Sequence, residues 1–417
     1  MSGESARRVA ITGLGVVSPW GSDVEEFFDR LLAGESAIRH HRTDDGHLSI
    51  SMPAVHCPHF DATQEVGRAS AAMDRSAQMS FAASNQAWQQ AGLPIPEQPD
   101  RGAAVYWGTA LAGTLTYEQG YREMLQKGRE RVPPLSLILG MNNAAASHLA
   151  IHFRLGGPCL TYTIACASAA AAIGEAWQAI RDGRCRVALT GGADSPMSLA
   201  VVRAWEALRV LAPIGNRGAE AACRPFSKDR AGLVLAEGAA ALVLEEWEHA
   251  RGRGARILAE LAGYGSTCDA SHLVKPSADG QYDAMHQALT TAALGPGDID
   301  YLNAHGTATR EGDPIEIEAI RRLYGEHAPG LAVSATKSMH GHLMGATGAT
   351  EALVCVQALR RNATPPTAHL AELEPACAGV AHVREAGVER PLRACMSNSF
   401  AFGGSNSVMV LRQAEGT

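Results

Sequence analysis

The chain has 417 residues, of which 46% are hydrophobic and 19% are charged, a composition typical of a well-buried globular protein. This length exceeds what one ordinary hydrophobic core supports, so we expect two packed units or one large duplicated unit. The formal net charge of -7 gives no electrostatic reason to expect nucleic acid or an anionic membrane as a partner.

Short strand-like runs alternate with longer helix-like segments along the chain, which predicts an α/β fold. Apolar residues at helical spacing predict a helix from Cys166 to the stop signal at Asp182 and Gly183. Asp313 before Pro314 predicts the N-cap and first turn of another helix. The expected strands lie, in chain order, near residues 8–15, 103–108, 186–194, 240–246, 299–307, 331–337, 394–400 and 407–411.

A charged, glycine-bearing stretch around residue 250 divides the chain. We expect one unit over residues 1–255 and a second over residues 256–417. No internal repeat is visible in the sequence. No run reaches the roughly 18 to 20 apolar residues that a membrane helix needs, and the N-terminus has no signal-peptide pattern, so we expect no membrane association.

Four glycine- or alanine-rich turns each follow a strand-like run directly. They read TIACASA at Cys166, NAHGTAT at His305, TKSMHGHLMGATG at Lys337 and His342, and NSFAFGGSN at Phe402. Loops at the carboxyl ends of strands are where side chains of an α/β sheet converge on a ligand, and small residues let a substrate approach the backbone. A thiol, two imidazoles and an ammonium at such turns indicate a covalent catalytic site.

Cys166 is the expected nucleophile. A cysteine in the first turn of a helix lies at the positive end of the helix dipole, so we expect a lowered thiol pKa and a reactive thiolate. The alternative is that Cys166 is a small buried hydrophobe without a catalytic task. Cys159, Cys185 and Cys355 lie in or beside apolar runs and are expected to be packing residues.

The remaining motifs argue against metal and dinucleotide chemistry. Nine scattered cysteines without a Cys-x-x-Cys pair indicate reduced thiols in a cytoplasmic protein rather than disulfides or structural zinc. His340 and His342 form a His-x-His pair without a third ligand at a recognisable spacing, so we expect no metal. The stretch ITGLGVVSPWG lacks the third glycine of a dinucleotide site, so we expect no NAD.

Six motifs, in order, resemble those of the β-ketoacyl-acyl carrier protein synthases, the condensing enzymes of fatty acid and type II polyketide assembly. They are VAITGLGVVSPWG, TIACASA, RPFSKDRAGLVLAEGA, YLNAHGTATREGDPIE, TKSMHGHLMGATGATEA and NSFAFGGSN, and they extend over nearly the whole chain. The resemblance implies a thiolase-like fold, with two similar halves stacked as five αβαβα layers, and usually a dimer. It also implies no tightly bound cofactor, because this family's substrates arrive on the phosphopantetheine of an acyl carrier protein.

The same resemblance implies catalytic roles for the residues that match these motifs. Cys166 would accept an acyl group, and His305 and His342 would hydrogen-bond the malonyl thioester carbonyl as carbon dioxide leaves. The resulting enolate would attack the acyl-Cys166 thioester in a decarboxylative Claisen condensation. Lys337 would tune the electrostatics around His342, and Glu351 would be a buried partner that orders this region.

The substrate-binding positions of the family also have counterparts. The backbone N–H groups of Cys166 and Phe402 match the oxyanion hole, and the Phe402 side chain matches the gate of the acyl pocket. The resemblance further implies that pantetheine is held by two threonines and that other substrate contacts come from apolar side chains. These matching positions are Thr307, Thr309, Phe400, Phe402 and Leu111.

The chain departs from the family next to the nucleophile. It has Ala167, Ser168, Ala169 and Ala170 where glycine or serine-glycine is usual. This departure favours a polyketide or polyene pathway slightly over fatty acid biosynthesis. The two histidines are typical of an elongating enzyme, since thiolases pair their nucleophile with a histidine and a second cysteine, so a thiolase-type degradative enzyme is a distant alternative.

Carrier docking is expected at basic residues, because acyl carrier proteins are acidic. Arg68, Arg75 and Arg209 match docking positions, although few other basic residues lie near the first two. The chain is expected to act as a homodimer or, alternatively, as a subunit that is active only as a heterodimer with a homologous, chain-length-factor-like chain. In either case the resemblance places the segment from about residue 103 to residue 160 at the contact.

Overall fold

The computed structural model describes residues 7–44 and 49–414, and it confirms the α/β class. In this part of the chain an 11-stranded sheet extends through the molecule. Its strands are β1 (Val9–Val17), β4 (Ala103–Gly108), β5 (Cys159–Tyr162), β6 (Val187–Asp194), β8 (Gly238–Glu246), β9 (Ala259–Cys268), β10 (Tyr301–Asn303), β11 (Ala332–Ser334), β13 (Ala381–His382), β15 (Ala394–Phe400) and β16 (Ser405–Arg412).

The sheet consists of two halves that join only where β1 pairs with β9, at Ala10 and Ile11. The first half has the order β5-β4-β6-β8-β1, and the second has the order β11-β10-β15-β16-β9, with β13 added at its edge. In each half the first two pairings are parallel and the last two are antiparallel. The halves therefore share one topology, and the two similar halves implied by the family resemblance are confirmed.

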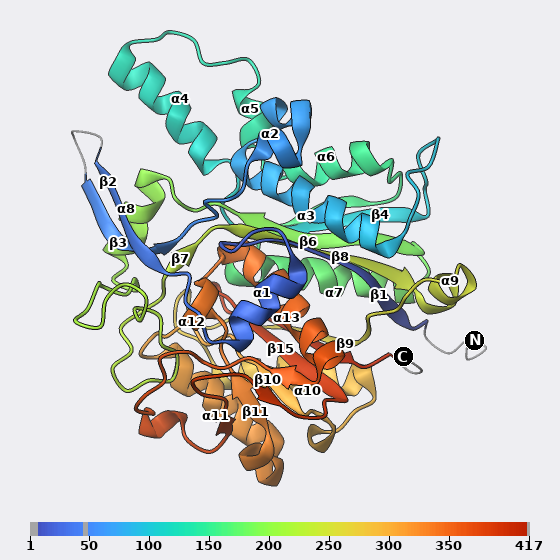
Figure 1. The fold of residues 1–417 in the computed structure, drawn as a ribbon, viewed down its shortest axis with the longest axis vertical. Coiled ribbons are helices and arrows are strands. Elements are labelled where there is room, and N and C mark those ends of the chain that lie inside the picture. The colour runs from blue at the N-terminus through green and yellow to red at the C-terminus, as the bar shows by residue number, and fades with distance from the viewer. Residues whose placement is uncertain (1–6, 45–48, 415–417) are drawn as a thin grey trace.

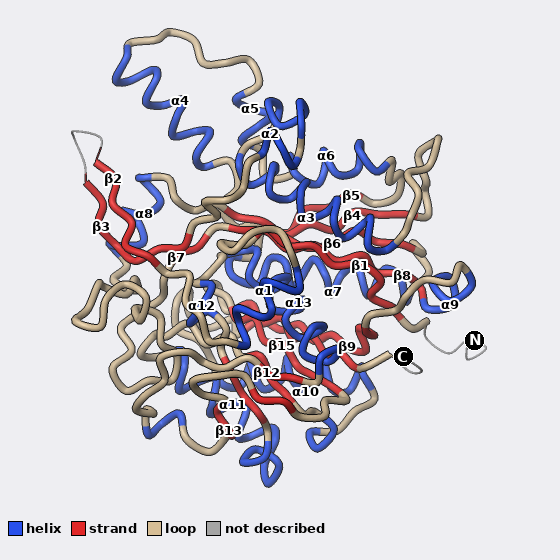
Figure 2. Tube along the Cα trace, in the orientation of Figure 1, coloured by secondary structure: helices blue, strands red, loops and turns tan. Residues whose placement is uncertain are grey.

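Three layers of helices alternate with the two halves of the sheet, which gives the expected five-layered αβαβα arrangement (Figures 1 and 2). The central layer is α7 (Ser168–Arg181) and α13 (Thr347–Arg361), which share one buried core with β1 and β8. The outer helices cover the other face of each half with separate cores. They are α3 (Arg75–Ala91) and α6 (Ala144–Phe153) on the first half, and α10 (Ala278–Ala292) and α11 (Gly312–Tyr324) on the second.

Glycine and alanine set the spacing between these layers. A Cβ atom at Gly13 or Gly15 of β1 would lie 2.0 or 1.9 Å from a backbone oxygen of α3, so the Gly-x-Gly of the first strand serves helix packing. A Cβ atom at Gly108 would lie 2.3 Å from the backbone nitrogen of Ala169 at the start of α7. Gly108 therefore allows the start of the central helix α7 to lie directly against the end of β4.

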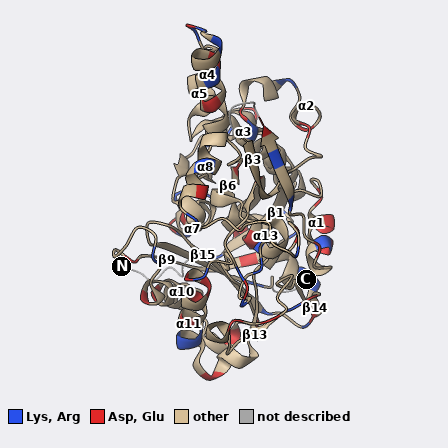
Figure 3. Ribbon diagram, turned by 90° about the vertical axis from the view of Figure 1, so that its left-hand side faces the viewer, with Lys and Arg blue, Asp and Glu red and all other residues tan. Residues whose placement is uncertain are grey.

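Two features extend from the layered body. Helices α4 (Thr114–Lys127) and α5 (Ser136–Gly140) form a projecting arm (Figures 1 and 3), and β2 (Arg39–Asp44) and β3 (Ser49–Val55) form a hairpin that pairs with β7 (Leu235–Ala236). The remaining elements are α1 (Val24–Leu32), α2 (Ala62–Glu65), α8 (Leu199–Ala207), α9 (Trp247–Gly252), α12 (Lys337–His340), β12 (Ala363–Thr364) and β14 (Val388–Glu389). Among the described residues, none of the helices combines the length and apolar character that crossing a membrane requires.

Two local predictions are wrong. Helix α11 begins at Gly312 with Glu311 at its N-cap, so Asp313 lies inside the first turn. Its carboxylate instead accepts a hydrogen bond of 2.8 Å from the backbone N–H of Phe226, because that buried donor needs a partner. Cys159 is exposed on the edge strand β5, so it packs into no core of this chain.

Candidate active site

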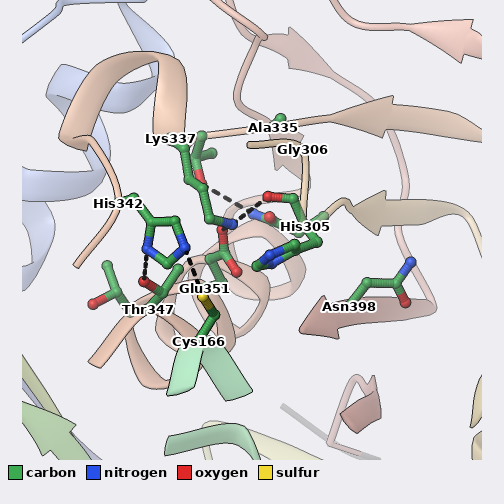
Figure 4. Close-up of polar contacts among 12 residues, drawn as sticks. Cys166, His305, Gly306, Ala335, Lys337, His342, Thr347, Glu351 and Asn398 are labelled. Carbon is green, nitrogen blue, oxygen red and sulfur yellow. Dashed lines mark hydrogen bonds and ion pairs between the residues drawn. The ribbon is translucent and has the colours of Figure 1, made fainter. Parts of the chain in front are cut away.

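The structure brings together the turns that carry the thiol, the two imidazoles and the ammonium (Figure 4). Cys166 lies in a single 3-10 turn directly before α7, and His305 follows β10. Lys337 begins α12 after β11, and His342 follows that helix. Each side chain therefore comes from a loop beyond the carboxyl end of a strand, where an α/β sheet presents its ligand-binding residues.

His342 is oriented by its own loop. The backbone N–H of Met344 donates a hydrogen bond of 3.0 Å to Nδ1 of His342, and Thr347 Oγ1 lies 3.1 Å from the same nitrogen. Because Nδ1 accepts from a backbone donor, the neutral ring carries its proton on Nε2. That Nε2 atom lies 3.1 Å from Sγ of Cys166, so the imidazole presents a hydrogen-bond donor beside the sulfur (Figure 4).

The expectation of a lowered pKa for Cys166 is wrong. Burial raises the pKa of the Cys166 thiol to about 11, and the Lys337 ammonium and the backbone N–H groups of Phe402 and Cys166 only partly oppose this effect. The position before α7 is therefore not enough to give a resting thiolate, because desolvation of the charged form outweighs it. At neutral pH Cys166 is therefore a thiol with thiolate-stabilising groups around it.

His305 is fixed through its backbone at both ends. Its N–H donates to Oε1 of the buried Glu316 at 2.8 Å, and its carbonyl oxygen accepts a hydrogen bond from Nζ of Lys337. The rings of His305 and His342 stand almost perpendicular, with centroids 5.7 Å apart. Burial, followed by the Lys337 charge, holds the pKa of both His305 and His342 well below the ordinary value, so both rings are neutral.

Lys337 and Glu351 form an ion pair that is completely buried. Nζ of Lys337 lies 2.6 Å from Oε1 of Glu351, and neither side chain is exposed to solvent. Burial raises the pKa of Glu351 to about 7, while the Lys337 ammonium acts in the opposite direction. Because the same ammonium contacts the carbonyl of His305, the pair connects α13 to the loop that carries this histidine.

A cavity of about 490 Å³ opens onto the thiol. Its lining includes Cys166, both histidines and four of the positions predicted to contact substrate, Thr307, Thr309, Phe400 and Phe402. The hydroxyl oxygens of Thr307 and Thr309 lie 3.1 Å apart on one wall. Lys337 and Glu351 do not line this cavity, so they act on it through His305 and the surrounding backbone.

Phe402 and Trp205 both line this cavity, and they also pack in an apolar cluster beside it. Its ring stacks on Trp205 of α8, with centroids 5.9 Å apart and an interplanar angle of 25°. Leu111 does not line the cavity, but it packs with Phe402 against a hydrophobic cluster that includes Trp205 and Met344. The sequence analysis did not single out Trp205, because this residue belongs to no motif. It did not single out Glu316 either, although Glu316 lies within the matched stretch YLNAHGTATREGDPIE.

The three predicted docking arginines have different surroundings. Arg209 is exposed and lines the cavity, together with the exposed Lys275 and Arg310, which the sequence analysis did not single out. Arg68 is exposed but does not line the cavity. Arg75 makes a two-point contact with Glu237, at 2.6 and 2.7 Å, so its charge is already paired within the chain.

The thiol and the two imidazoles also lie close enough to be considered as metal ligands. Among the described residues, Cys166, His305 and His342 have ligand atoms within 4.8 Å of one another. The other member of the His-x-His pair, His340, bonds to Thr336 and Gly341 instead, so the pair does not act as one ligand set.

Comparison with known proteins identifies the class to which this fold and site belong. The family model "Beta-ketoacyl synthase, N-terminal domain" matches residues 6–250, and "Beta-ketoacyl synthase, C-terminal domain" matches residues 258–371. The chain thus belongs to the β-ketoacyl synthase family, within the thiolase superfamily. It is an acyltransferase that forms carbon–carbon bonds, and its type is that of a KAS II-like ketosynthase.

Individual relatives match along almost the whole chain. Nodulation protein E of Rhizobium sp. (strain N33) is 40% identical over 410 residues, which cover 98% of this chain and 99% of the relative. The 3-oxoacyl-[acyl-carrier-protein] synthase 2 of Staphylococcus aureus (strain COL) is 36% identical, with the same coverage.

Two solved structures are also similar. The ishigamide ketosynthase/chain length factor has a TM-score of 0.90 and 33% identity, and the match covers 98% of this chain and 100% of that one. A type II polyketide ketosynthase, bound to the hexaketide and in complex with its acyl carrier protein, has a TM-score of 0.89 and 29% identity, with coverage of 99% and 100%.

Proposed function

We propose that Cys166 is the nucleophile of this condensing enzyme and that His305 and His342 stabilise the enolate of its second substrate. The observation that carries this proposal is the 3.1 Å approach of His342 Nε2 to the sulfur, with Nδ1 held as an acceptor. A neutral imidazole in this tautomer is a hydrogen-bond donor, not a base. It suits an oxygen that gains negative charge next to the thiol.

In the first half-reaction the Cys166 thiol attacks the thioester of an acyl carrier protein. The new carbon–sulfur bond forms as the bond to phosphopantetheine breaks, and the thiol proton passes to the departing pantetheine sulfur. The backbone N–H groups of Cys166 and Phe402 receive the oxyanion of the tetrahedral intermediate. Both N–H groups lower the pKa of the Cys166 thiol, which supports their assignment as oxyanion donors.

In the second half-reaction malonyl-carrier protein enters the same cavity, with its pantetheine arm along Thr307 and Thr309 and beside Phe400. Carbon dioxide leaves, and the thioester oxygen of the enolate accepts hydrogen bonds from His305 and His342. The enolate carbon attacks the acyl carbonyl, Cys166 leaves as thiolate and takes a proton, and a β-ketoacyl chain two carbons longer remains on the carrier. Lys337 and Glu351 keep the histidines neutral and in place.

The carrier is proposed to dock at the cavity mouth. Arg209, Lys275 and Arg310 give this rim three exposed positive charges, and Glu311 is the exposed acidic residue in the same lining. The excess of positive charge suits an acidic carrier and the phosphate of its pantetheine. Arg68 would extend this contact, and Arg75 would contribute less because Glu237 pairs with it. In Figure 3 basic and acidic residues are otherwise interspersed over the fold, so the rim supplies the local preference.

The pathway is proposed to be type II polyketide or polyene biosynthesis, with fatty acid biosynthesis as the second candidate. The similarity to a type II polyketide ketosynthase and to the ishigamide ketosynthase/chain length factor supports the first candidate. The similarity to 3-oxoacyl-[acyl-carrier-protein] synthase 2 supports the second. We also propose a cytoplasmic location and retain residues 1–255 and 256–417 as its two units.

A homodimer or a heterodimer with a chain-length-factor-like subunit is proposed to form over the arm and the β5 edge. Leu125 and Leu137 of the arm are 81% and 67% exposed, Ile151 of α6 is 77% exposed, and Leu160 of the edge strand β5 is 46% exposed. Apolar side chains in such numbers beside an unpaired strand edge are typical of a surface that another chain covers. Native mass spectrometry, alone and after co-expression with a homologous chain lacking the cysteine, distinguishes the two assemblies.

The nucleophile is tested by intact mass after the purified chain is mixed with saturated and polyunsaturated acyl-carrier proteins. We expect an adduct of the acyl mass that Cys166→Ala abolishes, and the preferred chain indicates the pathway. If wild type takes no acyl group from any donor but does so after co-expression with a homologous chain, the obligate heterodimer is correct. An adduct that persists in Cys166→Ala contradicts the assignment of the nucleophile.

A further inference from the structure

Asp194, the last residue of β6, is a buried carboxylate whose partners are all uncharged. Its side chain has no exposure to solvent, and among the described residues no lysine, arginine or histidine forms an ion pair with it. Four donors converge on it instead. Oδ1 accepts from Thr109 Oγ1 at 2.8 Å and from the Leu111 N–H at 2.9 Å, and Oδ2 accepts from the N–H groups of Ala110 at 2.8 Å and Gly345 at 2.6 Å.

These donors come from two segments that are far apart in the chain. Residues 109–111 form the loop after β4, and Gly345 lies three residues after His342. Within the second segment, Met344, the residue before Gly345, donates its N–H to Nδ1 of His342. The carboxylate therefore connects the loop after β4 to the segment that sets the tautomer of His342.

The same two segments contribute to the apolar cluster that contains Trp205 and contacts Phe402. Leu111 from the first and Met344 from the second pack in one hydrophobic cluster with Phe402 and Trp205. The two segments are closely packed where they meet, because a Cβ atom at Gly345 would lie 2.5 Å from the backbone nitrogen of Ala110 and 2.7 Å from Oδ2 of Asp194. A small shift of either segment therefore moves both the apolar wall and the His342 loop.

Only a carboxylate satisfies this arrangement. Four donors need two oxygens with two lone pairs each, and asparagine offers one such oxygen and an NH₂ group that would face two donors. Burial raises the pKa of Asp194 to about 6, and the four hydrogen bonds oppose that rise. The four donors thus keep the carboxylate ionised in a buried environment, and they belong to the two segments described above.

We propose that Asp194 is a positioning residue that fixes Leu111 relative to the His342–Gly345 segment. One carboxylate thereby sets the positions of both the acyl-pocket wall and the catalytic imidazole. This inference rests on the proposed function. Asp194 touches neither substrate nor thiol, so its loss affects the selection of acyl chains and the condensation step rather than the presence of the nucleophile.

The test compares Asp194→Asn with Thr109→Val and with Ser76→Ala. Thr109→Val removes one of the four donors. Ser76→Ala is the matched control, because it loses a buried hydrogen bond of 3.0 Å to the carbonyl of Ala193 without touching either segment. For each full-length variant, kcat and KM of condensation are measured over a series of acyl-carrier chain lengths, alongside intact-mass acylation of Cys166.

We expect Asp194→Asn to retain acylation but to lose about tenfold in kcat and to change its ranking of chain lengths. Thr109→Val should change the ranking in the same direction by a smaller factor, which decides the matter if Asp194→Asn does not fold. An unchanged ranking and kcat in a folded Asp194→Asn, or the same change in Ser76→Ala, overturns this inference alone. Wild type that takes no acyl group, either alone or after co-expression with a homologous chain, overturns the proposed function and, with it, the inference.

Discussion

Nε2 of His342 lies 3.1 Å from Sγ of Cys166, although 176 residues separate the two in the sequence. The contact exists because the loops that precede the two central helices, α7 and α13, meet where these helices begin. The first half supplies the sulfur and the second half supplies the donor. This division of labour leads to separable effects for the two half-reactions.

Replacing either histidine should impair condensation more than acylation. His342→Ala and His305→Ala each remove one hydrogen-bond donor to the enolate, which should reduce condensation by about 100-fold or more. Acyl transfer to Cys166 should still be visible by intact mass, because that step uses the thiol and backbone donors. Loss of acylation together with condensation in both variants would show that the imidazoles act on the thiol itself.

Cys166 should become more reactive toward iodoacetamide as pH rises. Its folded-state pKa of about 11 lies above the ordinary value, so the thiol keeps its proton at pH 7. The thiolate fraction should rise about tenfold for each pH unit from 7 to 10. Peptide-level mass spectrometry measures this rise, with the exposed Cys268 as internal reference. An alkylation rate that is constant above about pH 7.5 would contradict the raised pKa and support the lowered pKa expected from the helix dipole.

Breaking the buried ion pair should destabilise the fold. Glu351→Gln leaves the Lys337 ammonium without a counter-charge in a site that solvent does not reach, so the free energy of unfolding should fall by about 3 kcal/mol. Urea denaturation measures the loss. Lys228→Ala, which breaks an exposed pair with Glu372, is the control and should leave the midpoint unchanged. Equal midpoints for the two variants would contradict a structural role for the buried pair.

Trp205 should influence which acyl chains enter the site. Trp205→Ala removes the ring on which Phe402 stacks, so Phe402 loses its resting position and the ratio of kcat/KM between long and short acyl chains should change by roughly fivefold. Trp205→Phe keeps an aromatic partner and should stay close to wild type. The same competition assay, run with mixed acyl-carrier proteins, measures both. No difference between Trp205→Ala and Trp205→Phe would show that the stack has no part in selection.

Arg209→Glu should weaken docking of the carrier without affecting chemistry. Reversing one charge at the cavity rim should raise KM for the acyl carrier protein by about tenfold at low salt, and by less at high salt because mobile ions screen the contact. kcat should be unchanged. Arg184→Glu alters an exposed arginine that does not line the cavity and serves as control. Equal KM values for the two variants would place the docking site elsewhere.

Much of the candidate site could be predicted because its reactive residues lie in short contiguous stretches of the sequence. Cys166, His305 and His342 each lie in a glycine- or alanine-rich turn after a strand, and such turns are local signals. The shared topology of the two halves was not visible, because it resides in strand order and direction and not in residue identity. The reason for the Gly-x-Gly of β1, its close contact with α3, is a tertiary one that the sequence does not reveal.

The features that the sequence could not provide depend on residues brought together from a distance. The pKa of Cys166 is set by burial against segments from both halves, which local helix position does not reveal. Arg75 reads as a surface cation until its pairing with Glu237, 162 residues away, is seen. Trp205 and Asp194 carry no motif, and their partners, Phe402 and the loop after β4, are adjacent only in the folded chain.

The central claim is that a Cys166-bound acyl chain is extended by an enolate held between His305 and His342. A single-turnover experiment tests it most directly: the acyl-enzyme is isolated, malonyl-carrier protein is added, and both proteins are followed by intact mass. The account predicts that the adduct on Cys166 disappears as a β-ketoacyl carrier appears, and that in the double variant His305→Ala, His342→Ala the adduct persists with malonyl-carrier protein intact. Decarboxylation and chain transfer at the wild-type rate in that double variant would contradict it.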